Sequence, residues 1–291
     1  MKNSDAFPKI SIVTPSYNQE GFIEATIRSV VGQEYPNLEY IIIEDGSTDK
    51  SLEIIQRYQD RLAHLVVGPN KGFGGALNAG LKLCTGEIMA WINADDFYLT
   101  GAFETVARVF KDCPQIDWIV GASLICDPAG RPISINSSRG YGKSLFFSGR
   151  YLGGHPAWSG QWIPQESVFW RRSLWDRAGG TFLTERLQYG DFELWSRFWQ
   201  FSDLYMLPVP LAAYRCHPQT YTSQQGHKST EPCTKILEAG GIETFSPINI
   251  RLRNFGCRFS DRFARYLGEP AKVLEFDLRS NRWKIVTNFV M

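Results

Sequence analysis

The sequence predicts an α/β fold with a mostly parallel central sheet that is flanked by helices. Short apolar runs rich in β-branched residues alternate with segments whose apolar side chains recur at helical spacing. Two of the apolar runs end in adjacent acidic residues, at Glu44-Asp45 and at Asp95-Asp96. Ligands of open α/β sheets bind just beyond the carboxyl ends of the parallel strands. The acidic pairs therefore mark the edge of the sheet where a site is expected.

The elements follow in β-α-β order through the first 112 residues, which favours parallel strands joined by helices. Compact apolar runs predict strands at residues 10–14, 38–44, 63–67 and 87–92. Helical spacing predicts helices at residues 20–33, 49–59, 72–83 and 100–111. The later pattern is less regular, with short strands expected at 118–126 and 166–170 and a helix that begins near Asp191.

Residues 221–291 are expected to form a C-terminal extension to a catalytic domain that covers residues 1–220. The extension interleaves five arginines with large apolar residues, at Arg251, Arg253, Arg258, Arg262 and Arg265. A basic helix of this kind is typical of peripheral contact with an anionic membrane, and equally of a helix that packs on the main domain or mediates a homodimer. Two apolar runs around Arg279-Ser280-Asn281 predict a terminal hairpin.

The composition narrows the class of protein. The formal net charge is +1, so no broad basic field points to nucleic acid as a partner. The sequence has no apolar signal segment at its start and no apolar run long enough to span a bilayer. The six cysteines form no CxxC pair and are expected to be reduced thiols. A cytoplasmic protein is therefore expected, at the inner face of the membrane if the basic segment binds lipid.

Three strand ends carry residues suited to a nucleotide. Carboxylates such as Asp95 and Asp96 are oxygen ligands that suit Mg²⁺ or Mn²⁺, although a single Asp there could instead cap a helix. The Glu44-Asp45 turn continues into Gly46, which allows a tight backbone turn. The first strand is expected to stop at Pro15, and Tyr17 offers a ring on which a base can stack. Together these strand ends indicate a nucleotide crevice.

Four segments, in order, carry a resemblance to a known family: Thr14-Pro15-Ser16-Tyr17-Asn18, Glu44-Asp45-Gly46-Ser47-Thr48-Asp49, Asn70-Lys71-Gly72 through Asn78-Ala79-Gly80, and Asn93-Ala94-Asp95-Asp96. Their order and spacing resemble the family 2 glycosyltransferases, which are inverting, nucleotide-sugar-dependent enzymes with the GT-A fold. The similarity runs from about residue 9 to about residue 220. It implies a donor half at about 1–112 and an acceptor half at about 113–220.

The resemblance implies transfer of a sugar from a nucleotide-diphosphate donor, with a UDP-sugar favoured, to a hydroxyl of a glycan or lipid-linked acceptor of the bacterial envelope. The donor-binding residues that it implies are Thr14, Pro15, Tyr17, Asp45, Asn78, Asn93 and Asp95. Asp95 would bind a divalent cation, Mn²⁺ or Mg²⁺. His217 is a second candidate ligand or a contact to the diphosphate, although a lone histidine before Pro218 is also typical of a packed or turn residue. Asn93 stands where the family commonly has Asp, so a cation recruited together with the diphosphate is expected.

Asp191 matches the Asp of the family's Glu-Asp motif, with Gly190 where Glu often stands. The resemblance implies that Asp191 is the general base that deprotonates the acceptor hydroxyl, which gives direct displacement and inversion. From the residues alone, Asp191 could equally cap the helix that follows it and keep a low pKa. The expected acceptor-binding residues are Asp96, Gln165, Glu166 and Trp158.

Two other classes of function stay open from the sequence. A glycosidase would also use carboxylates, but it needs neither the Asp45 turn nor a metal at Asp95. A catalytically inactive scaffold subunit would bind nucleotide or glycan and show no turnover.

Overall fold

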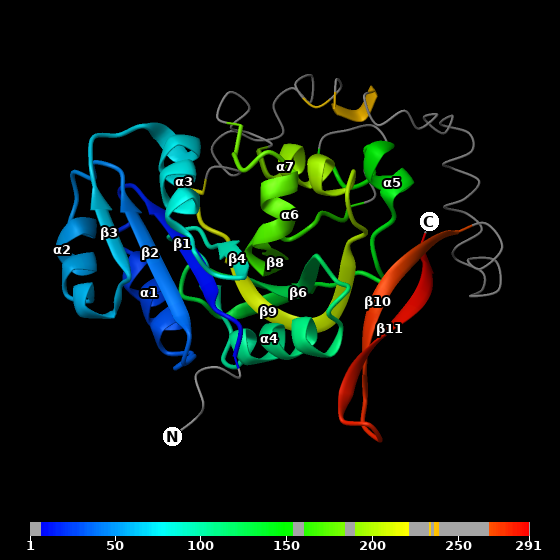
Figure 1. The fold of residues 1–291 in the computed structure, drawn as a ribbon. Helices are drawn as coiled ribbons and strands as arrows, with labels where there is room; N and C mark the ends of the chain where they lie inside the picture. The colour runs from blue at the N-terminus through cyan, green and yellow to red at the C-terminus, as the bar shows by residue number, and fades with distance from the viewer. Residues whose placement is uncertain are drawn as a thin grey trace.

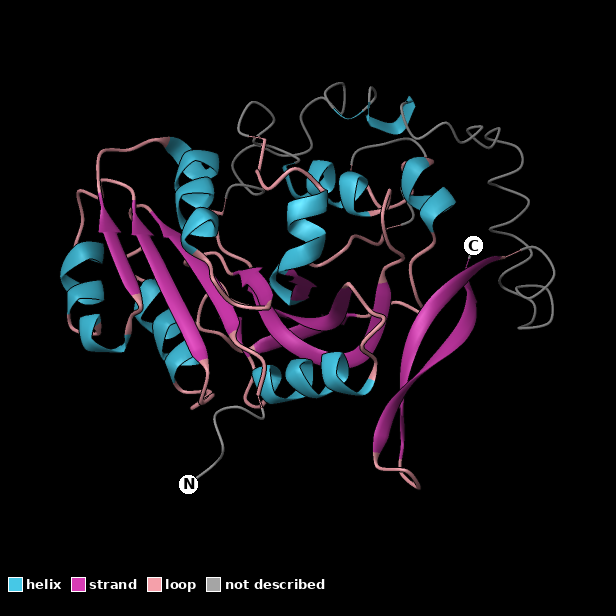
Figure 2. Cartoon of the chain, in the orientation of Figure 1, coloured by secondary structure: helices cyan, strands magenta, loops and turns pink. Residues whose placement is uncertain are grey.

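The computed structural model describes residues 7–153, 160–183, 190–220, 233, 236–238 and 268–290. Trp158 and the arginine-rich stretch 251–267 lie outside these residues. The predicted α/β fold is confirmed, since one continuous twisted sheet carries helices on both faces (Figures 1 and 2). The strand order along the sheet is β11-β10-β9-β6-β8-β4-β1-β2-β3, with β5 paired to β9 and β7 paired to β6.

The strands are β1 (Ile10–Ser16), β2 (Leu38–Glu44), β3 (His64–Val67), β4 (Ile88–Trp91), β5 (Phe97–Tyr98), β6 (Trp118–Cys126), β7 (Pro132–Asn136), β8 (Val168–Arg171), β9 (Tyr205–Arg215), β10 (Glu269–Asp277) and β11 (Arg282–Val290). The helices are α1 (Ile23–Val31), α2 (Ser51–Gln56), α3 (Gly72–Leu83), α4 (Ala102–Asp112), α5 (Lys143–Phe147), α6 (Arg172–Arg177) and α7 (Gly190–Phe198).

Strand direction brings the functional loops to one edge of the sheet. Strands β1, β2, β3 and β4 are parallel to one another, and β6, β9 and β10 are parallel to one another. The strand β8 is antiparallel to both β4 and β6, so those two groups run in the same direction. The loops that follow β1, β2, β4 and β9 therefore meet at a common edge. This arrangement is the one in which α/β sheets bind ligands.

Helices cover the two faces of the parallel strands. Helix α3 packs on β1 and β2, while α1 and α2 pack together on the opposite side (Figure 1). Helix α1 buries Ile23, Ile27 and Val30, which are spaced by three and four residues as helical periodicity predicts. The strand β1 is buried over its whole length, which explains its unbroken apolar character.

Strand β9 was not expected from the sequence. Its eleven residues include Pro208 and Pro210, which lack the backbone N–H that a strand interior normally uses. The pairing of β9 with β6 shifts register at the same place, and these irregularities accommodate the prolines. The prediction that Pro15 stops the first strand was also wrong, because β1 continues through Pro15, opposite Ile43, to Ser16.

The predicted C-terminal hairpin is present and is longer than expected. Strand β10 pairs with β9 in parallel at Lys272 and Val273, so the hairpin extends the central sheet (Figure 1). The carboxylate of Glu269 accepts hydrogen bonds from the backbone N–H groups of Ser144 (2.8 Å) and Leu145 (3.0 Å). These bonds satisfy donors in the first turn of α5, a helix that the sequence did not predict.

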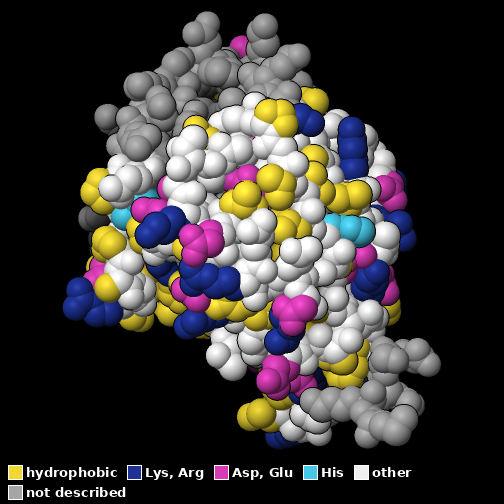
Figure 3. Space-filling model, turned by 90° about the vertical axis from the view of Figure 1, so that its left-hand side faces the viewer, with side chains coloured by type: hydrophobic (Ala, Val, Ile, Leu, Met, Phe, Trp, Pro, Cys, Tyr) yellow, Lys and Arg dark blue, Asp and Glu magenta, His cyan; other side chains and the backbone are white. Residues whose placement is uncertain are grey.

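The surface carries charges of both signs. On the face shown in Figure 3, Lys and Arg side chains alternate with Asp and Glu side chains and leave no field of a single sign. Within the described ranges, none of the helices has the length and apolar character needed to cross a bilayer.

Gly80 is required where α3 crosses the sheet. A Cβ atom at position 80 would overlap Cγ1 of Val13 and lie 3.1 Å from Cγ1 of Ile43. Ala favours a helix over Gly by about 1 kcal/mol, but overpacking costs about 1–3 kcal/mol. We therefore expect Gly80→Ala to lower the free energy of unfolding in urea denaturation. Gly21→Ala is the control, because a Cβ at position 21 meets no atom within 4 Å. Equal stability of the two variants would contradict the close approach of α3 to β1.

Candidate active site

Asp95 and His217 meet beyond the ends of β4 and β9. Oδ2 of Asp95 lies 3.1 Å from Nε2 of His217, and the two side chains are 16% and 1% exposed. Nδ1 of His217 lies 3.1 Å from Oε1 of Gln219, and the imidazole packs on the ring of Phe22 at a centroid distance of 4.2 Å. A proton on Nδ1 that donates to Gln219 leaves the lone pair of Nε2 facing the Asp95 carboxylate.

The Asp95–His217 pair fits a divalent cation. At this distance Nε2–H can donate to the Asp95 carboxylate; with the proton on Nδ1 instead, the two acceptor atoms can hold a cation between them. Ligands about 2.1 Å from an octahedral ion also lie about 3 Å apart, as these two atoms do. Oδ1 of the neighbouring Asn93 is buried without a hydrogen-bond partner, and it is an oxygen of the type that Mg²⁺ and Mn²⁺ bind.

The protein side chains alone supply few metal ligands. Over the residues that the structure covers, no group of three or more His, Cys, Asp and Glu side chains converges as a metal centre. A cation held by Asp95 and His217 would have to complete its coordination with water or with phosphate oxygens, which is usual for Mg²⁺.

Asp96 is an interior residue that ties the site together. Its carboxylate accepts hydrogen bonds from the backbone N–H of Arg215 (2.9 Å) and from Nδ2 of Asn93 (3.3 Å), and its side chain is fully buried. Burial, with the nearby charges of Asp95 and Glu166, raises the pKa of Asp96 well above its usual value. The expected acceptor role of Asp96 conflicts with this placement, because neither carboxylate oxygen faces an open surface.

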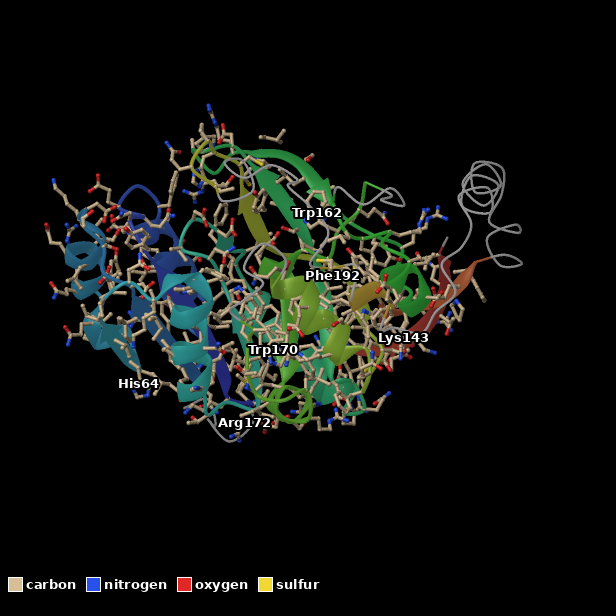
Figure 4. All side chains as sticks on the ribbon, turned by 90° about the horizontal axis from the view of Figure 1, so that it is seen from above. His64, Lys143, Trp162, Trp170, Arg172 and Phe192 are labelled. Carbon is tan, nitrogen blue, oxygen red and sulfur yellow. The ribbon has the colours of Figure 1, made fainter. Side chains whose placement is uncertain are left out.

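Asp191 lies in the first turn of α7, as its position before an amphipathic helix predicted. Helix α7 is anchored by Trp195, whose ring stacks on Trp91 of β4 at 5.6 Å with an interplanar angle of 18°. In Figure 4, Phe192 of the same helix and Trp170 of β8 lie in the middle of the molecule, between α3 and α5. The strand that leads to Asp95 and the helix that carries Asp191 are therefore packed directly on each other.

The carboxylate of Asp191 combines a hydrogen bond to the backbone of α7 with a raised pKa. Its carboxylate is partly buried and accepts a hydrogen bond from the backbone N–H of Phe192 (2.8 Å). Burial outweighs that hydrogen bond and raises the pKa of Asp191. The alternative that Asp191 keeps a low pKa as a helix cap is therefore wrong.

Glu166 links the two acidic positions. The hydroxyl of Ser123 donates to its carboxylate, which is buried in a 3-10 turn over Gln165–Ser167. Burial raises the pKa of Glu166, and the charges of Asp191 and Asp95 raise it further. Glu166 therefore experiences the charges of both Asp95 and Asp191. The side chain of Gln165 faces inward and donates to the carbonyl of Trp91 (2.8 Å).

Some of the expected donor-binding residues lie at the edge of the sheet, and others direct their side chains toward the protein interior. Asp45 is buried and accepts a hydrogen bond from the backbone N–H of Lys71 (2.9 Å), and Tyr17 is 46% exposed. Thr14 and Pro15 lie inside β1, where the Thr14 hydroxyl is 3.1 Å from the hydroxyl of Tyr40. Asn78 directs its amide to the backbone of Phe182. The structure thus brings Asp45 and Tyr17 to the edge and turns Thr14 and Asn78 toward protein partners.

Sequence reasoning missed the support that Arg215 and Phe22 give to this edge. The guanidinium of Arg215 is stacked between the rings of Phe22 (5.0 Å) and Phe97 (5.1 Å). Phe22 therefore contacts both Arg215 and His217. Arg215 stands two positions before His217 in the sequence, which was the available signal, but nothing in the sequence indicated which aromatic rings would flank the arginine.

The chain is similar to known glycosyltransferases. The model of the family described as Glycosyl transferase family 2 matches residues 11–171, more than half of the 291 residues. An uncharacterised glycosyltransferase of Rickettsia typhi is 28% identical over 227 residues, which cover 77% of this chain and 69% of the relative. A GalNAc(5)-diNAcBac-PP-undecaprenol beta-1,3-glucosyltransferase of Campylobacter jejuni is 31% identical over 122 residues, 36% of this chain and 38% of that protein.

Two solved structures share the fold. Residues 1–349 of TarS of S. aureus, in complex with UDP-GlcNAc, align with a TM-score of 0.62 and 16% identity, over 89% of this chain and 73% of that one. The mannosyltransferase PcManGT of Pyrobaculum calidifontis, in complex with GDP-Man and Mn²⁺, aligns with a TM-score of 0.54 and 19% identity, over 90% and 79%. The fold is therefore that of the GT-A glycosyltransferases, and the chain belongs to glycosyl transferase family 2.

Proposed function

We propose that this glycosyltransferase is an inverting enzyme that transfers a sugar from a nucleotide-diphosphate donor to a hydroxyl of a glycan or lipid-linked acceptor. The observation that carries the proposal is the Asp95–His217 pair beyond β4 and β9, together with the packing of α7, which carries Asp191, on β4 through Trp195 and Trp91. A metal-binding position and a proton acceptor in one site are what this reaction requires.

Asp95 and His217 would hold a divalent cation, Mn²⁺ or Mg²⁺, together with the donor diphosphate. Such an ion neutralises the negative charge that develops on a departing diphosphate. The buried Oδ1 of Asn93 supports the same assignment, because it is an oxygen with no protein partner beside Asp95. The mannosyltransferase with a similar fold was solved with Mn²⁺.

Asp191 would deprotonate the attacking hydroxyl. Its raised pKa supports this role, since a carboxylate with a higher proton affinity accepts a proton more readily in the transition state. One base that activates the nucleophile directly gives single displacement at the anomeric carbon, and hence inversion. Gln165, Glu166 and Trp158 stay proposed acceptor-side residues, with Trp158 outside the described residues.

The donor is proposed to be a UDP-sugar. The exposed ring of Tyr17 and the buried carboxylate of Asp45 are suited to stacking on a base and to accepting its N–H. The TarS structure of similar fold contains UDP-GlcNAc. The name of the Campylobacter relative specifies an undecaprenol-linked acceptor. A lipid-linked acceptor here would place the enzyme at the inner membrane face, with residues 251–267 as the proposed contact.

Donor binding is tested by thermal shift with UDP, GDP, dTDP and CMP, each with Mn²⁺, Mg²⁺ or EDTA. A ligand at about 100 times its Kd stabilises the folded state by about 2.7 kcal/mol, which is readily seen as a rise in Tm. We expect UDP with Mn²⁺ to raise Tm and EDTA to abolish the shift. A UDP shift that is unchanged in EDTA would exclude the cation, and the absence of a shift with every nucleotide would exclude the donor site.

The metal position is tested by Asp95→Asn, which keeps the shape of the side chain and removes its charge. We expect the Mn²⁺-dependent part of the UDP shift to be lost, because a neutral amide is a weaker ligand for a hard cation. Asp60→Asn, at an exposed carboxylate in the same half, is the matched control and should retain the full shift. If Asp95→Asn kept the Mn²⁺-dependent part of the UDP shift, the cation would be bound by residues other than Asp95.

The base is tested by Asp191→Asn, with the exposed Asp203→Asn as the control. We expect kcat/KM to fall by about 10²–10⁴-fold in Asp191→Asn, while the UDP shift persists. In the wild type, the carboxylate must be deprotonated to act, so kcat/KM should fall as the pH drops through its pKa. Because burial raises that pKa, the midpoint should lie above the usual aspartate range. Full activity in Asp191→Asn would refute the assignment.

A further inference from the structure

Asn78 of α3 hydrogen-bonds to the segment 181–182, which comes before α7, the helix that carries Asp191. Its Nδ2 donates to the carbonyl of Phe182 (2.6 Å), and its Oδ1 accepts from the backbone N–H of Phe182 (2.7 Å). The hydroxyl of Thr181 donates to the same Oδ1 (3.3 Å). One amide thus pairs with both backbone groups of a residue that belongs to no helix or strand. These contacts replace the ladder bonds that a strand would have provided.

Phe182 in turn occupies the space beside Gly190. A Cβ atom at position 190 would overlap the Phe182 ring, whose Cε2 would lie 3.2 Å away. The ring is 2% exposed and packs edge-on against Trp91 at 5.8 Å and Phe73 at 6.1 Å, so it has little room to move. The Phe182 ring fits against the backbone only because Gly190 has no side chain. Gly190 directly precedes the Asp191 backbone.

Arg197 attaches the same segment to α7 from the other side. Its guanidinium donates to the carbonyl of Thr181 (2.7 Å) and forms a two-point ion pair with Glu193, with both N–O distances 2.9 Å. The segment at 181–182 is therefore fixed to α3 in the donor half through Asn78 and to α7 through Arg197. This segment therefore contacts both halves of the site, and the ring of Phe182 lies beside Gly190, the residue before Asp191.

We propose that Asn78 and Phe182 are positioning residues for Asp191, which fix the base relative to the donor half of the site. The inference rests on the proposed base role of Asp191. It assigns Asn78 a task distinct from the donor contact expected from the family pattern, since the amide is already paired with the Phe182 backbone. Phe182 occupies the space that a side chain at position 190 would need, directly beside the backbone of Asp191.

The consequence for catalysis follows from geometry. A base that is displaced by about 1 Å from its productive position can cost about 10²-fold in rate. Loss of the Asn78 amide frees the Phe182 backbone, and a methyl group at position 190 pushes on the Phe182 ring. Both changes therefore displace Asp191 without touching the Asp95–His217 pair.

The test compares Asn78→Ala, Gly190→Ala, Phe182→Leu and the double variant Gly190→Ala/Phe182→Leu, with Lys82→Ala on an exposed position of α3 as the control. Hydrolysis of UDP-GlcNAc with Mn²⁺, in which water supplies the attacking hydroxyl and takes the sugar, gives the rate as UDP release. Calorimetry gives the Kd of UDP. We expect Asn78→Ala and Gly190→Ala to lower kcat by about 10²-fold with the Kd of UDP unchanged. The double variant should recover activity relative to Gly190→Ala, because Leu lacks the ring atoms that the new methyl group meets.

A second measurement does not require turnover. In protein labelled with ¹³C at the aspartate carboxyl carbons, the Asp191 signal is the one absent from Asp191→Asn. Its titration midpoint should move in Gly190→Ala and return in the double variant. An unmoved midpoint together with additive effects on kcat would overturn the inference.

The outcomes separate this inference from the proposed function. Full activity in Asp191→Asn would refute the base itself. Loss of activity in Asp191→Asn would support Asp191 as the base. If Asn78→Ala then binds UDP more weakly at unchanged kcat, Asn78 contacts the donor and does not position Asp191, which would overturn the inference. Tm values for all variants identify any that lose activity by unfolding.

Discussion

The fully buried carboxyl group of Asp96 is the contact on which the site depends. This carboxylate accepts hydrogen bonds from the backbone N–H of Arg215 at the end of β9 and from the side-chain amide of Asn93 after β4. The backbone carbonyl of Asp96 accepts a hydrogen bond from the hydroxyl of Thr26 in α1 (2.6 Å). Three elements distant in sequence therefore converge on one residue. Its chain neighbour Asp95 and His217, two residues beyond Arg215, come within hydrogen-bonding distance as a result.

The same arrangement concentrates negative charge. Asp96 experiences the charges of Asp95 and Glu166, and Glu166 experiences those of Asp95 and Asp191. Burial raises the pKa of Asp96, Glu166 and Asp191. Close carboxylates in a poorly solvated region are stabilised by protons or by a cation. The site is thus prepared to attract positive charge, and the neutral Asn93 in place of a further acid keeps the repulsion smaller.

The sequence predicted what depends on local pattern and left out what depends on distant contacts. The β-α-β order, the strand end at Asp95 and the helix at Asp191 follow from periodicity and composition, and the structure contains them. Strand β9 was missed because Pro208 and Pro210 interrupt its pattern and only pairing with β6 makes it a strand. The inward turn of Asn78 toward Phe182 spans 104 positions, and no local signal reports such a partner. The raised pKa of Asp191 likewise arises from packing that the sequence does not display.

The tie between Glu269 and α5 has a consequence for the order of folding. The bonded groups are separated by 125 and 124 residues, so that contact closes late during synthesis from the ribosome. The strands β1 to β4 can associate while the later chain is still being made, but β9 keeps part of one edge unpaired until β10 is available. An unpaired strand edge is a template for association with other chains. The hairpin therefore covers this edge of β9 and makes β11 the outermost strand of the sheet.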